Sequence, residues 1–323
     1  MPSPLDALAT NLFSPMVLAF ALGALATLVK SDLKVPDALY DSLAIYLLLA
    51  IGLKGGVALS EARLSEVALP AIVTLALGAA TPVWCFAILR KLGGLDRVNA
   101  AAIAAHYGSV SAVTFIACLA FLQGIGQPFE GFVPALVALL EVPGIVVALL
   151  LARRGGAAHW AQTVRELLTG KSVVLLAGGL AIGWLTGRSG FAQVAPLFEG
   201  LFKGALVLFL LEMGIVAARR LRDLKRVGPF LIGFGVVMPV VHAAVGVGLG
   251  TLAGLSVGGA TVLGVLAASA SYIAAPAAVR IALPEANPGL YLTAALAITF
   301  PFNLAVGIPL THAMARLVHG GSG

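Results

Sequence analysis

The sequence predicts an all-α integral membrane protein with ten transmembrane helices, arranged as two five-helix repeats of inverted topology. Three observations predict this fold. First, 60% of the 323 residues are hydrophobic, only 11% are charged, and the mean hydropathy is +1.04, whereas soluble domains carry about 25% charged residues. Second, ten apolar stretches approach the roughly 20 residues that cross a bilayer as a helix. Third, short motifs recur in the two halves at an offset of about 158 residues.

The ten predicted spans are separated by charged residues or by Gly- and Pro-rich breaks. The first and sixth spans are short, so we expect them to tilt or to lean on their neighbours. Because no Lys or Arg precedes Lys30, the basic region of a cleaved signal peptide is missing, and we expect the first span to be retained. In chain order the spans cover residues 14–29, 39–59, 67–89, 99–122, 131–152, 172–186, 200–218, 228–252, 259–281 and 290–315.

The basic residues orient these spans. Fifteen of the 20 Lys and Arg lie in loops after odd-numbered spans, four lie on the other side, and Lys54 lies inside the second span. Cytoplasmic loops are enriched in Lys and Arg. The odd loops are therefore predicted to be cytoplasmic, and both termini to lie outside, in a bacterial inner membrane. Orientation accounts for most of the net charge of +6, so no nucleic-acid partner is expected.

The longest connection, residues 153–171, is too short for a cytoplasmic domain. Within it, residues 159–168 (HWAQTVRELL) have the composition of a short amphipathic helix lying on the membrane surface. A solvated linker is the alternative. We therefore divide the chain into a first repeat (residues 1–155), a cytoplasmic linker (156–171) and a second repeat (172–323).

Four motifs recur in the same order in both halves. Since each half holds five spans, an odd number, the second half enters the membrane from the opposite side. Inverted repeats are typical of secondary transporters, whose sites lie near the bilayer midplane where discontinuous helices meet. The aligned positions are Gly56 with Gly214, Pro82 with Pro239, Ser109 and Ser111 with Ser269 and Ser271, and Pro143 with Pro301.

The fourth and ninth spans are the predicted discontinuous helices, crossing at the site. Residues 106–114 (HYGSVSAVT) and 267–276 (AASASYIAAP) gather small and hydroxylated residues at mid-span. Unwound backbone in a membrane needs protein, water or a solute as partner, and half-helix N-termini favour an anion. Close packing of small residues is the alternative, but the occurrence in both halves favours a site. The predicted substrate-binding residues are Gly108, Ser109, Val110, Ser111, Ser269, Ala270, Ser271 and Tyr272.

Other polar residues inside the spans are candidates for ion coupling. Glu141 could bind a cation or carry a proton, since an ionisable group in a membrane is a functional candidate by default; a structural ion pair is the alternative. Lys54 and Glu212 occupy equivalent repeat positions and are predicted to pair. His106 and His242 are candidate proton carriers. The predicted coupling-ion residues are Glu141, Thr114, Asn303 and Thr299.

The sequence favours a transporter over an enzyme. It contains no His and Cys cluster with metal-ligand spacing, no phosphate-binding loop and no acidic pair within one span. Cys85 and Cys118 lie in apolar runs, and two such thiols imply neither a disulfide framework nor a metal site. No cofactor is expected, apart from a candidate bound Na⁺.

At these motifs the chain resembles the sodium-dependent bicarbonate transporter (SbtA-type) permease family over nearly its whole length. The resemblance implies secondary active transport of bicarbonate with sodium coupling, an elevator-like mechanism, homotrimers and a PII-like cytoplasmic regulator. It also implies a gate domain from spans 1, 2, 6 and 7, and a core domain from spans 3–5 and 8–10. The motifs are IGLKGGVAL (residues 51–59), HYGSVSAVTF (106–115), EVP (141–143), SASYIAAPA (269–277) and LPEANPGLYL (283–292), the last two being the most specific.

Two positions depart from that family. Tyr272 stands where members carry an aspartate, and Lys54 stands where they tend to have a neutral polar residue. Losing a carboxylate removes an oxygen ligand for sodium, so proton coupling is one alternative. A symporter of organic anions on the bile-acid-symporter type of fold is a second alternative. A third is a cytoplasmic docking platform built on the basic cluster at residues 219–226 (RRLRDLKR).

Overall fold

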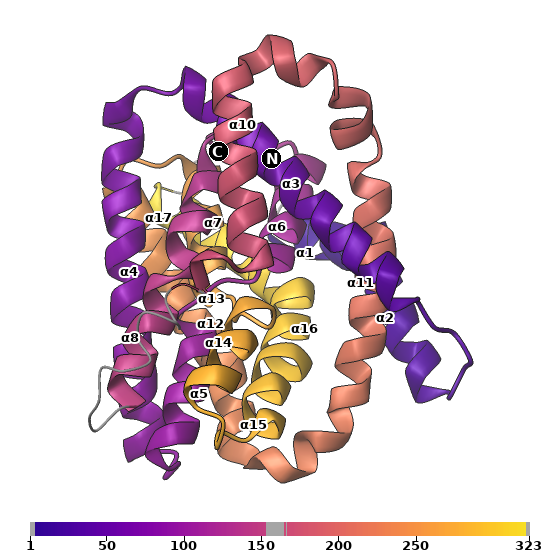
Figure 1. The fold of residues 1–323 in the computed structure, drawn as a ribbon, viewed down its shortest axis with the longest axis vertical. Coiled ribbons are helices and arrows are strands. Elements are labelled where there is room, and N and C mark those ends of the chain that lie inside the picture. Colours follow the sequence, from indigo (N-terminus) through magenta and orange to yellow (C-terminus); the bar gives the residue numbers. More distant parts are fainter. Residues whose placement is uncertain (1–3, 153–164, 166, 321–323) are drawn as a thin grey trace.

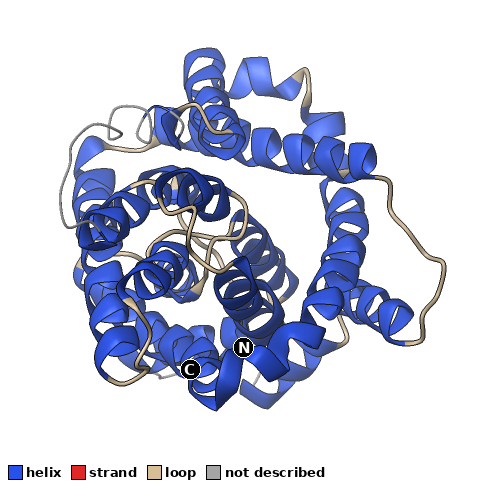
Figure 2. Ribbon diagram, turned by 60° about the horizontal axis from the view of Figure 1, so that its bottom comes forward, coloured by secondary structure: helices blue, strands red, loops and turns tan. Residues whose placement is uncertain are grey.

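The computed structural model describes residues 4–152, 165 and 167–320, and among these it contains helices, turns and loops without strands (Figures 1 and 2). Seven helices are long and apolar enough to cross a membrane, or eight if one bent pair counts as a single span. These findings confirm the all-α membrane class and leave the number of ten spans a prediction. The predicted surface helix at residues 159–168 lies mostly outside the described residues.

The first half of the chain contains a bent pair of helices, two long helices and two interrupted ones. The first two helices form a pair bent by 53°, and α5 and α6 are separated by residues 108–111. The helices are α1 (Pro4–Leu12), α2 (Pro15–Leu28), α3 (Asp37–Glu61), α4 (Leu64–Lys91), α5 (Arg97–Tyr107), α6 (Ala112–Gly124), α7 (Val133–Glu141) and α8 (Pro143–Ala152).

The second half contains three long helices, then an interrupted one, and π-helical turns inside its last segment. Here α13 and α14 are separated by residues 269–273. The helices are α10 (Lys171–Ala192), α11 (Phe202–Arg220), α12 (Leu224–Leu252), α13 (Val257–Ala268), α14 (Ala274–Ala282), α15 (Pro288–Leu292), α16 (Phe300–Phe302) and α17 (Ile308–Val318). The short turns are η1 (Pro196–Gly200), η2 (Leu221–Asp223), η3 (Thr293–Thr299) and η4 (Asn303–Gly307).

Side-chain caps fix where three of the half-span helices begin. Asp96, Ser111 and Ser256 each accept backbone N–H hydrogen bonds in the first turns of α5, α6 and α13. Such caps satisfy amide groups that have no partner within the helix. The polar break at residues 108–111 thus lies between the end of α5 and the start of α6, and Ser111 caps the second helix.

The helices form two groups of contacts. In one group α3 packs along α10 and α2 along α11; in the other, α4 packs with α5 and α8, and α12 packs with α13 and α17. Both termini lie toward the same end of the molecule, opposite the end where α5 and α15 begin (Figure 1). We call the end with the termini the outer end and the opposite end the inner end, following the predicted orientation.

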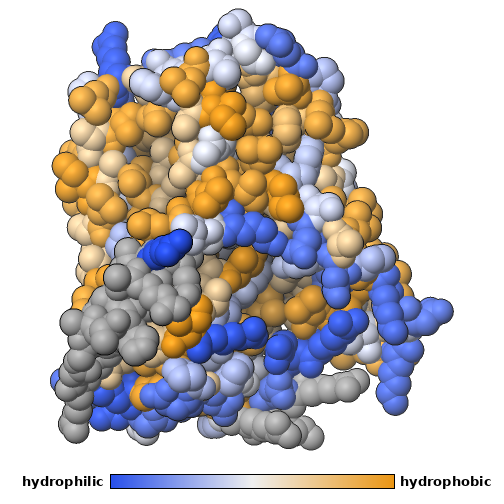
Figure 3. Space-filling view, in the orientation of Figure 1, coloured by the Kyte–Doolittle hydropathy of each residue, from blue (hydrophilic) through white to orange (hydrophobic). Residues whose placement is uncertain are grey.

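Exposed apolar side chains form a broad belt on the molecular surface. In Figure 3 this belt covers the upper part of the visible face, and hydrophilic residues gather toward the inner end. Leu22, Leu25 and Ile72 are 56%, 55% and 63% exposed in the isolated chain. An apolar surface of this extent is typical of contact with a membrane or a partner protein.

Small residues on α10 bring it close to α3. A Cβ atom on Gly183 would lie 2.1 Å from the Leu53 carbonyl oxygen, and Gly179 lies against Gly52. Gly187 continues the four-residue spacing of Gly179 and Gly183 but does not pack against α3: it has φ 58° and interrupts the helix, and a Cβ there would meet nothing within 4 Å. Spacing alone misses this, because glycine serves both close packing and left-handed backbone.

Replacing Gly183 by Val is expected to lower the free energy of unfolding by about 3 kcal/mol, because α3 and α10 must separate to admit the side chain. Thermal unfolding of the purified protein in detergent measures the effect. Gly178→Val on the same helix is the matched control, since a Cβ at Gly178 meets nothing within 4 Å. Equal melting temperatures for the two variants would contradict the tight α3–α10 contact.

Candidate functional site

The two helix breaks meet and exchange hydrogen bonds. The Ser111 N–H donates to the Ser269 hydroxyl oxygen at 2.9 Å, and the Ser271 N–H donates to the His106 carbonyl at 2.8 Å. Each break therefore satisfies a backbone group that lacks a helical partner, as a membrane interior requires. We call these two segments, residues 108–111 and 269–273, the crossing.

The four serines of the crossing are all buried, at 0 to 4% exposure, and each makes a local hydrogen bond. Ser109 donates to the Glu141 carbonyl at 2.9 Å, and Ser269 donates to the carbonyl of the last turn of α13 at 2.8 Å. Ser111 and Ser271 instead accept backbone N–H groups at the starts of α6 and α14, at 3.1 and 3.2 Å. Because a hydroxyl can both donate and accept, these two serines retain an O–H that can donate to a ligand.

Glycine backbone brings the fifth predicted span against the first break. A Cβ atom on Gly144 would lie 1.8 Å from the Gly108 carbonyl oxygen, and one on Gly108 would lie 3.1 Å from Gly144 Cα. The two main chains are therefore in direct contact. Val110 and Ala270, at 4% and 2% exposure, complete the buried lining of the two breaks.

A small cavity lies at the crossing. Its volume is about 10 Å³, which is room for about one water molecule. Glu141 is 4% exposed, and its Oε2 atom has no hydrogen-bond partner. Ser172, in the first turn of α10, lines the same cavity as this carboxyl group. The lining residues are Val110, Ser111, Ala112, Glu141, Ser172, Ser271, Tyr272 and Ile273.

Tyr272 has two kinds of contact at the crossing. Its side chain lines the cavity together with Ser111, and its ring packs edge-on against Phe300 with centroids 5.4 Å apart. The aromatic contact fits a packing role, and the position of the residue in the cavity lining fits a role in ligand contact.

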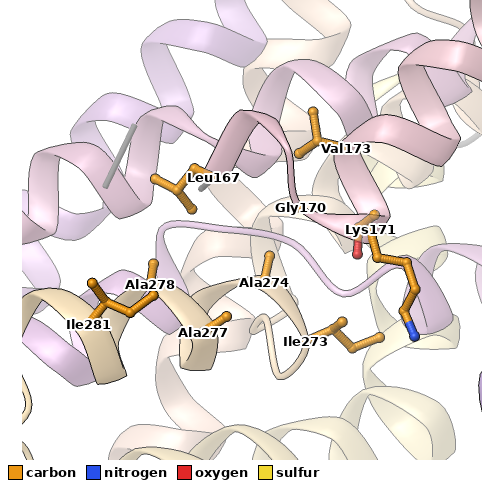
Figure 4. Close-up of a pocket in the computed structure, with 10 residues that line it drawn as sticks. Leu167, Gly170, Lys171, Val173, Ile273, Ala274, Ala277, Ala278 and Ile281 are labelled. Atoms are coloured by element: carbon orange, nitrogen blue, oxygen red, sulfur yellow. The ribbon is translucent and has the colours of Figure 1, made fainter. Parts of the chain in front are cut away.

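A larger cleft adjoins the crossing cavity toward the inner end. It has a volume of about 240 Å³ and lies between α14 and residues 167–173, which lead into α10. Figure 4 shows Leu167 and Val173 on one wall, with Ala274 and Ala278 on the other. Ser172 and Ile273 line both this inner cleft and the crossing cavity. They form the boundary between the buried carboxyl group of Glu141 and the inner cleft.

Two of the predicted coupling-ion residues lie next to the crossing. The Asn303 Nδ2 atom donates to the Ala268 carbonyl at 2.8 Å, where α13 ends, and leaves Oδ1 without a partner. Thr114 lies in the first turn of α6, and its buried Oγ1 also has no partner. These two atoms and Glu141 Oε2 are three buried oxygens that have no hydrogen-bond partner.

Thr299 is not brought to the crossing cavity. Its hydroxyl donates to the Gly235 carbonyl at 2.7 Å and lies 2.6 Å from the Tyr107 hydroxyl. These contacts join η3 to α12 and to the end of α5, so the hydroxyl is already occupied.

The two predicted proton carriers have different surroundings. His106 is fully buried beside the crossing; its Nδ1 lies 2.7 Å from the Ala102 carbonyl, its Nε2 has no partner, and its ring stacks on Tyr291. His242 lies between α4 and α12, where its Nε2 accepts from the Trp84 indole N–H at 2.8 Å. That nitrogen is therefore unprotonated, and His242 does not line the crossing cavity.

The predicted pairing of Lys54 with Glu212 is wrong. The Lys54 Nζ atom lies 2.8 Å from Glu199 Oε1, because the long side chain reaches the outer end, where η1 brings this carboxylate. Glu212 stays buried at 8% exposure, with Oε2 unpartnered. The Lys54–Glu199 pair lines an outer cavity of about 500 Å³, together with the Arg188–Glu61 ion pair.

Reasoning from the sequence missed Ser172 and Glu199. Ser172 starts a helix just after a lysine, and Glu199 lies in a loop between spans; neither interrupts an apolar run. Only the folded arrangement of α10 and η1 places them beside Glu141 and Lys54.

Comparison with known proteins identifies the family of the chain. No curated protein matches it. The family model of the Na⁺-dependent bicarbonate transporter superfamily matches residues 15–316. This range contains both breaks of the crossing, Glu141 and Lys54, and it covers nearly the whole chain. The protein therefore belongs to the Na⁺-dependent bicarbonate transporter superfamily.

Proposed function

We propose that the protein is a sodium-coupled secondary active transporter of bicarbonate in a bacterial inner membrane, and that it moves its substrate by an elevator-like mechanism. The observation that carries the proposal is the crossing. Two broken helices are hydrogen-bonded to each other beside a buried carboxyl group with an unpartnered oxygen. The superfamily match supports the choice of bicarbonate and sodium.

Helix contacts support ten spans arranged as an inverted 5+5 repeat. In such a repeat α3 corresponds to α11, and α10 corresponds to α2. The contact of α3 with α10 therefore has its counterpart in the contact of α11 with α2. At these two contacts a Cβ on Gly56 would lie 2.1 Å from the Leu180 carbonyl, and one on Gly214 would lie 2.0 Å from the Phe20 carbonyl. These four helices form the proposed gate domain, and the other spans form the core.

A second pair of matched contacts supports the same symmetry within the core. At the inner end the Asn287 N–H donates to the Asn99 side chain at 2.8 Å, next to the start of α5. At the outer end the Ser256 N–H donates to the Glu130 carboxylate at 2.6 Å, next to the start of α13. Each contact joins the loop before the last span of one repeat to the fourth span of the other.

The crossing suits a small oxyanion. Both α6 and α14 begin there, and helix N-termini carry partial positive charge that favours anions. The free O–H groups of Ser111 and Ser271 add donors for the oxygens of bicarbonate. Because the cavity of about 10 Å³ holds about one water, the crossing must open to admit the anion. Ser172 and Ile273 separate it from the inner cleft, so that cleft is the proposed route to the cytoplasm.

Sodium binding is assigned to the buried oxygens beside the anion. Hard cations prefer carboxylate, carbonyl and hydroxyl oxygens, and Glu141, Thr114 and Asn303 each offer one without a partner. A sodium ion and bicarbonate bound together with an ionised Glu141 leave one net negative charge at the site. Proton coupling through Glu141 or His106 is the second candidate, favoured by the burial of both groups.

Other parts of the proposal rest on the family resemblance. They are a homotrimeric assembly and a PII-like regulator on the cytoplasmic face. The organic-anion alternative is not favoured by the superfamily match, and the small crossing cavity argues for a compact substrate.

Proteoliposomes that contain the purified protein are expected to accumulate isotope-labelled bicarbonate when sodium is placed outside, with little effect of a protonophore. The expected dependence on sodium follows from the cation site at Glu141. Uptake that is indifferent to sodium and abolished by the protonophore would contradict sodium coupling and support proton coupling. Inhibition by a monocarboxylate without inhibition by unlabelled bicarbonate would support the organic-anion alternative.

A further inference from the structure

Lys54 is a basic side chain positioned on the wall of the gate domain. It is 36% exposed in the outer cavity of about 500 Å³, where it is held by Glu199 at 2.8 Å and lies 6.0 Å from the centre of the Phe202 ring. The opposite wall of that cavity comes from α6 and α7 of the core and presents Leu119, Gln123 and Pro134. Lys54 is thus a gate residue that faces the core.

The distance from Lys54 to the crossing follows from the lengths of two core helices, α6 and α7. Gly55 contacts Pro134 directly, since a Cβ on Gly55 would lie 2.5 Å from the Pro134 Cβ. Along α7, Pro134 precedes Glu141 by seven residues, which is about 10 Å at about 1.5 Å per residue. Along α6, Leu119 follows Ala112 by the same number of residues. Both helices therefore place Lys54 roughly 10 Å outward of the crossing.

The gate domain presents Ser172 to the core beside the crossing and Lys54 about 10 Å farther outward. In the described arrangement Ser172, at the inner end of α10, lines the crossing cavity together with Glu141. If the core moves outward along the gate by about 10 Å, Glu141 leaves Ser172 and takes the level that Pro134 now holds beside Gly55. The neutral serine is then replaced by an ammonium group.

We infer that Lys54 completes the anion site in the outward-facing state, where it donates a charge-assisted hydrogen bond to bicarbonate and exchanges Glu199 for the substrate. This inference rests on the proposed function and deepens it. The crossing itself offers an anion only helix ends and hydroxyl groups. A hydrogen bond from an ionised donor is about twice as strong as one between neutral groups, so Lys54 makes the outside affinity for the anion higher than the inside affinity.

Sided transport kinetics test the role of Lys54. In proteoliposomes of defined orientation, Lys54→Gln is expected to raise the KM for external bicarbonate about tenfold, the loss of roughly one charge-assisted hydrogen bond. The kcat and the KM measured from the cytoplasmic side should stay close to wild type. Lys203→Gln is the matched control, since it removes the same charge near the outer end but lines a different cavity. An unchanged external KM in Lys54→Gln, or the same increase in Lys203→Gln, would overturn the inference.

A crosslinking experiment keeps the test independent of substrate identity. Lys54→Cys paired with Ala112→Cys should crosslink with a short thiol reagent only when the core has moved outward. Ala58→Cys paired with Gly131→Cys reports the described arrangement, because a Cβ on Gly131 would lie 2.6 Å from that of Ala58. Crosslinking of both pairs supports the shift. If only the Ala58→Cys and Gly131→Cys pair reacts, Lys54 does not meet the crossing, and the inference is wrong. If the wild type takes up no bicarbonate, that result counts against the proposed function alone.

Discussion

Replacing Glu141 by Gln is expected to reduce sodium-driven bicarbonate uptake about 100-fold, the effect of removing one partner of a buried charge interaction. Glu141 is 4% exposed, its Oε2 has no protein partner, and it lines the crossing cavity. In the proposed mechanism the carboxylate gains a partner when sodium binds. Glutamine keeps the size and the polarity of the side chain but loses the charge, so the protein should fold while its sodium affinity falls.

Glu212→Gln is the matched control for this variant. Glu212 is also buried within a predicted span and also has an unpartnered Oε2, but it lies on α11 of the proposed gate and does not line the crossing cavity. Its uptake should remain near wild type. The measurement is uptake as a function of sodium concentration, with melting temperatures to verify folding. Wild-type sodium dependence in Glu141→Gln would remove Glu141 from the coupling site.

The location of the crossing could be predicted from the sequence, because an unwound helix in a membrane needs particular residues. Serines and glycines at mid-span are unfavourable in a helix that only contacts lipid, so their presence at residues 108–111 and 269–271 signals a break. The spacing of the repeat also predicts that the two breaks meet. The hydrogen bond from the Ser111 N–H to the Ser269 hydroxyl joins the two breaks.

Other partners could not be predicted, because they depend on how far side chains reach and on how loops fold. Lys54 and Glu212 align in the repeat, but a lysine extends several ångströms from its helix and can bring its charge toward the water. It therefore meets Glu199 on a turn that carries no apolar pattern. Thr299 was predicted to bind the coupling ion, yet its hydroxyl is held by Gly235 and Tyr107. Alignment gives position along a helix and does not give contacts.

Replacing Gly144 by Val is expected to abolish transport and to lower the free energy of unfolding by about 3 kcal/mol or more. The new Cβ would lie 1.8 Å from the Gly108 carbonyl oxygen and 2.7 Å from its Cα. These are backbone atoms, so no side-chain rotation relieves the clash, and the segment between α7 and α8 must move away from the first break. This movement breaks the hydrogen bond from Ser109 to the Glu141 carbonyl and displaces the carboxyl group that the proposed sodium site requires.

Gly124→Val, at the end of α6, is the control for this variant, because a Cβ there meets nothing within 4 Å. It should retain both stability and uptake. Gly144→Ala tests the same contact with the smallest possible side chain and should lose uptake more than it loses melting temperature, since a displacement of about 1 Å in a reacting or binding geometry can cost about 100-fold in rate. Full uptake by Gly144→Ala would show that the position of Glu141 does not depend on this backbone contact.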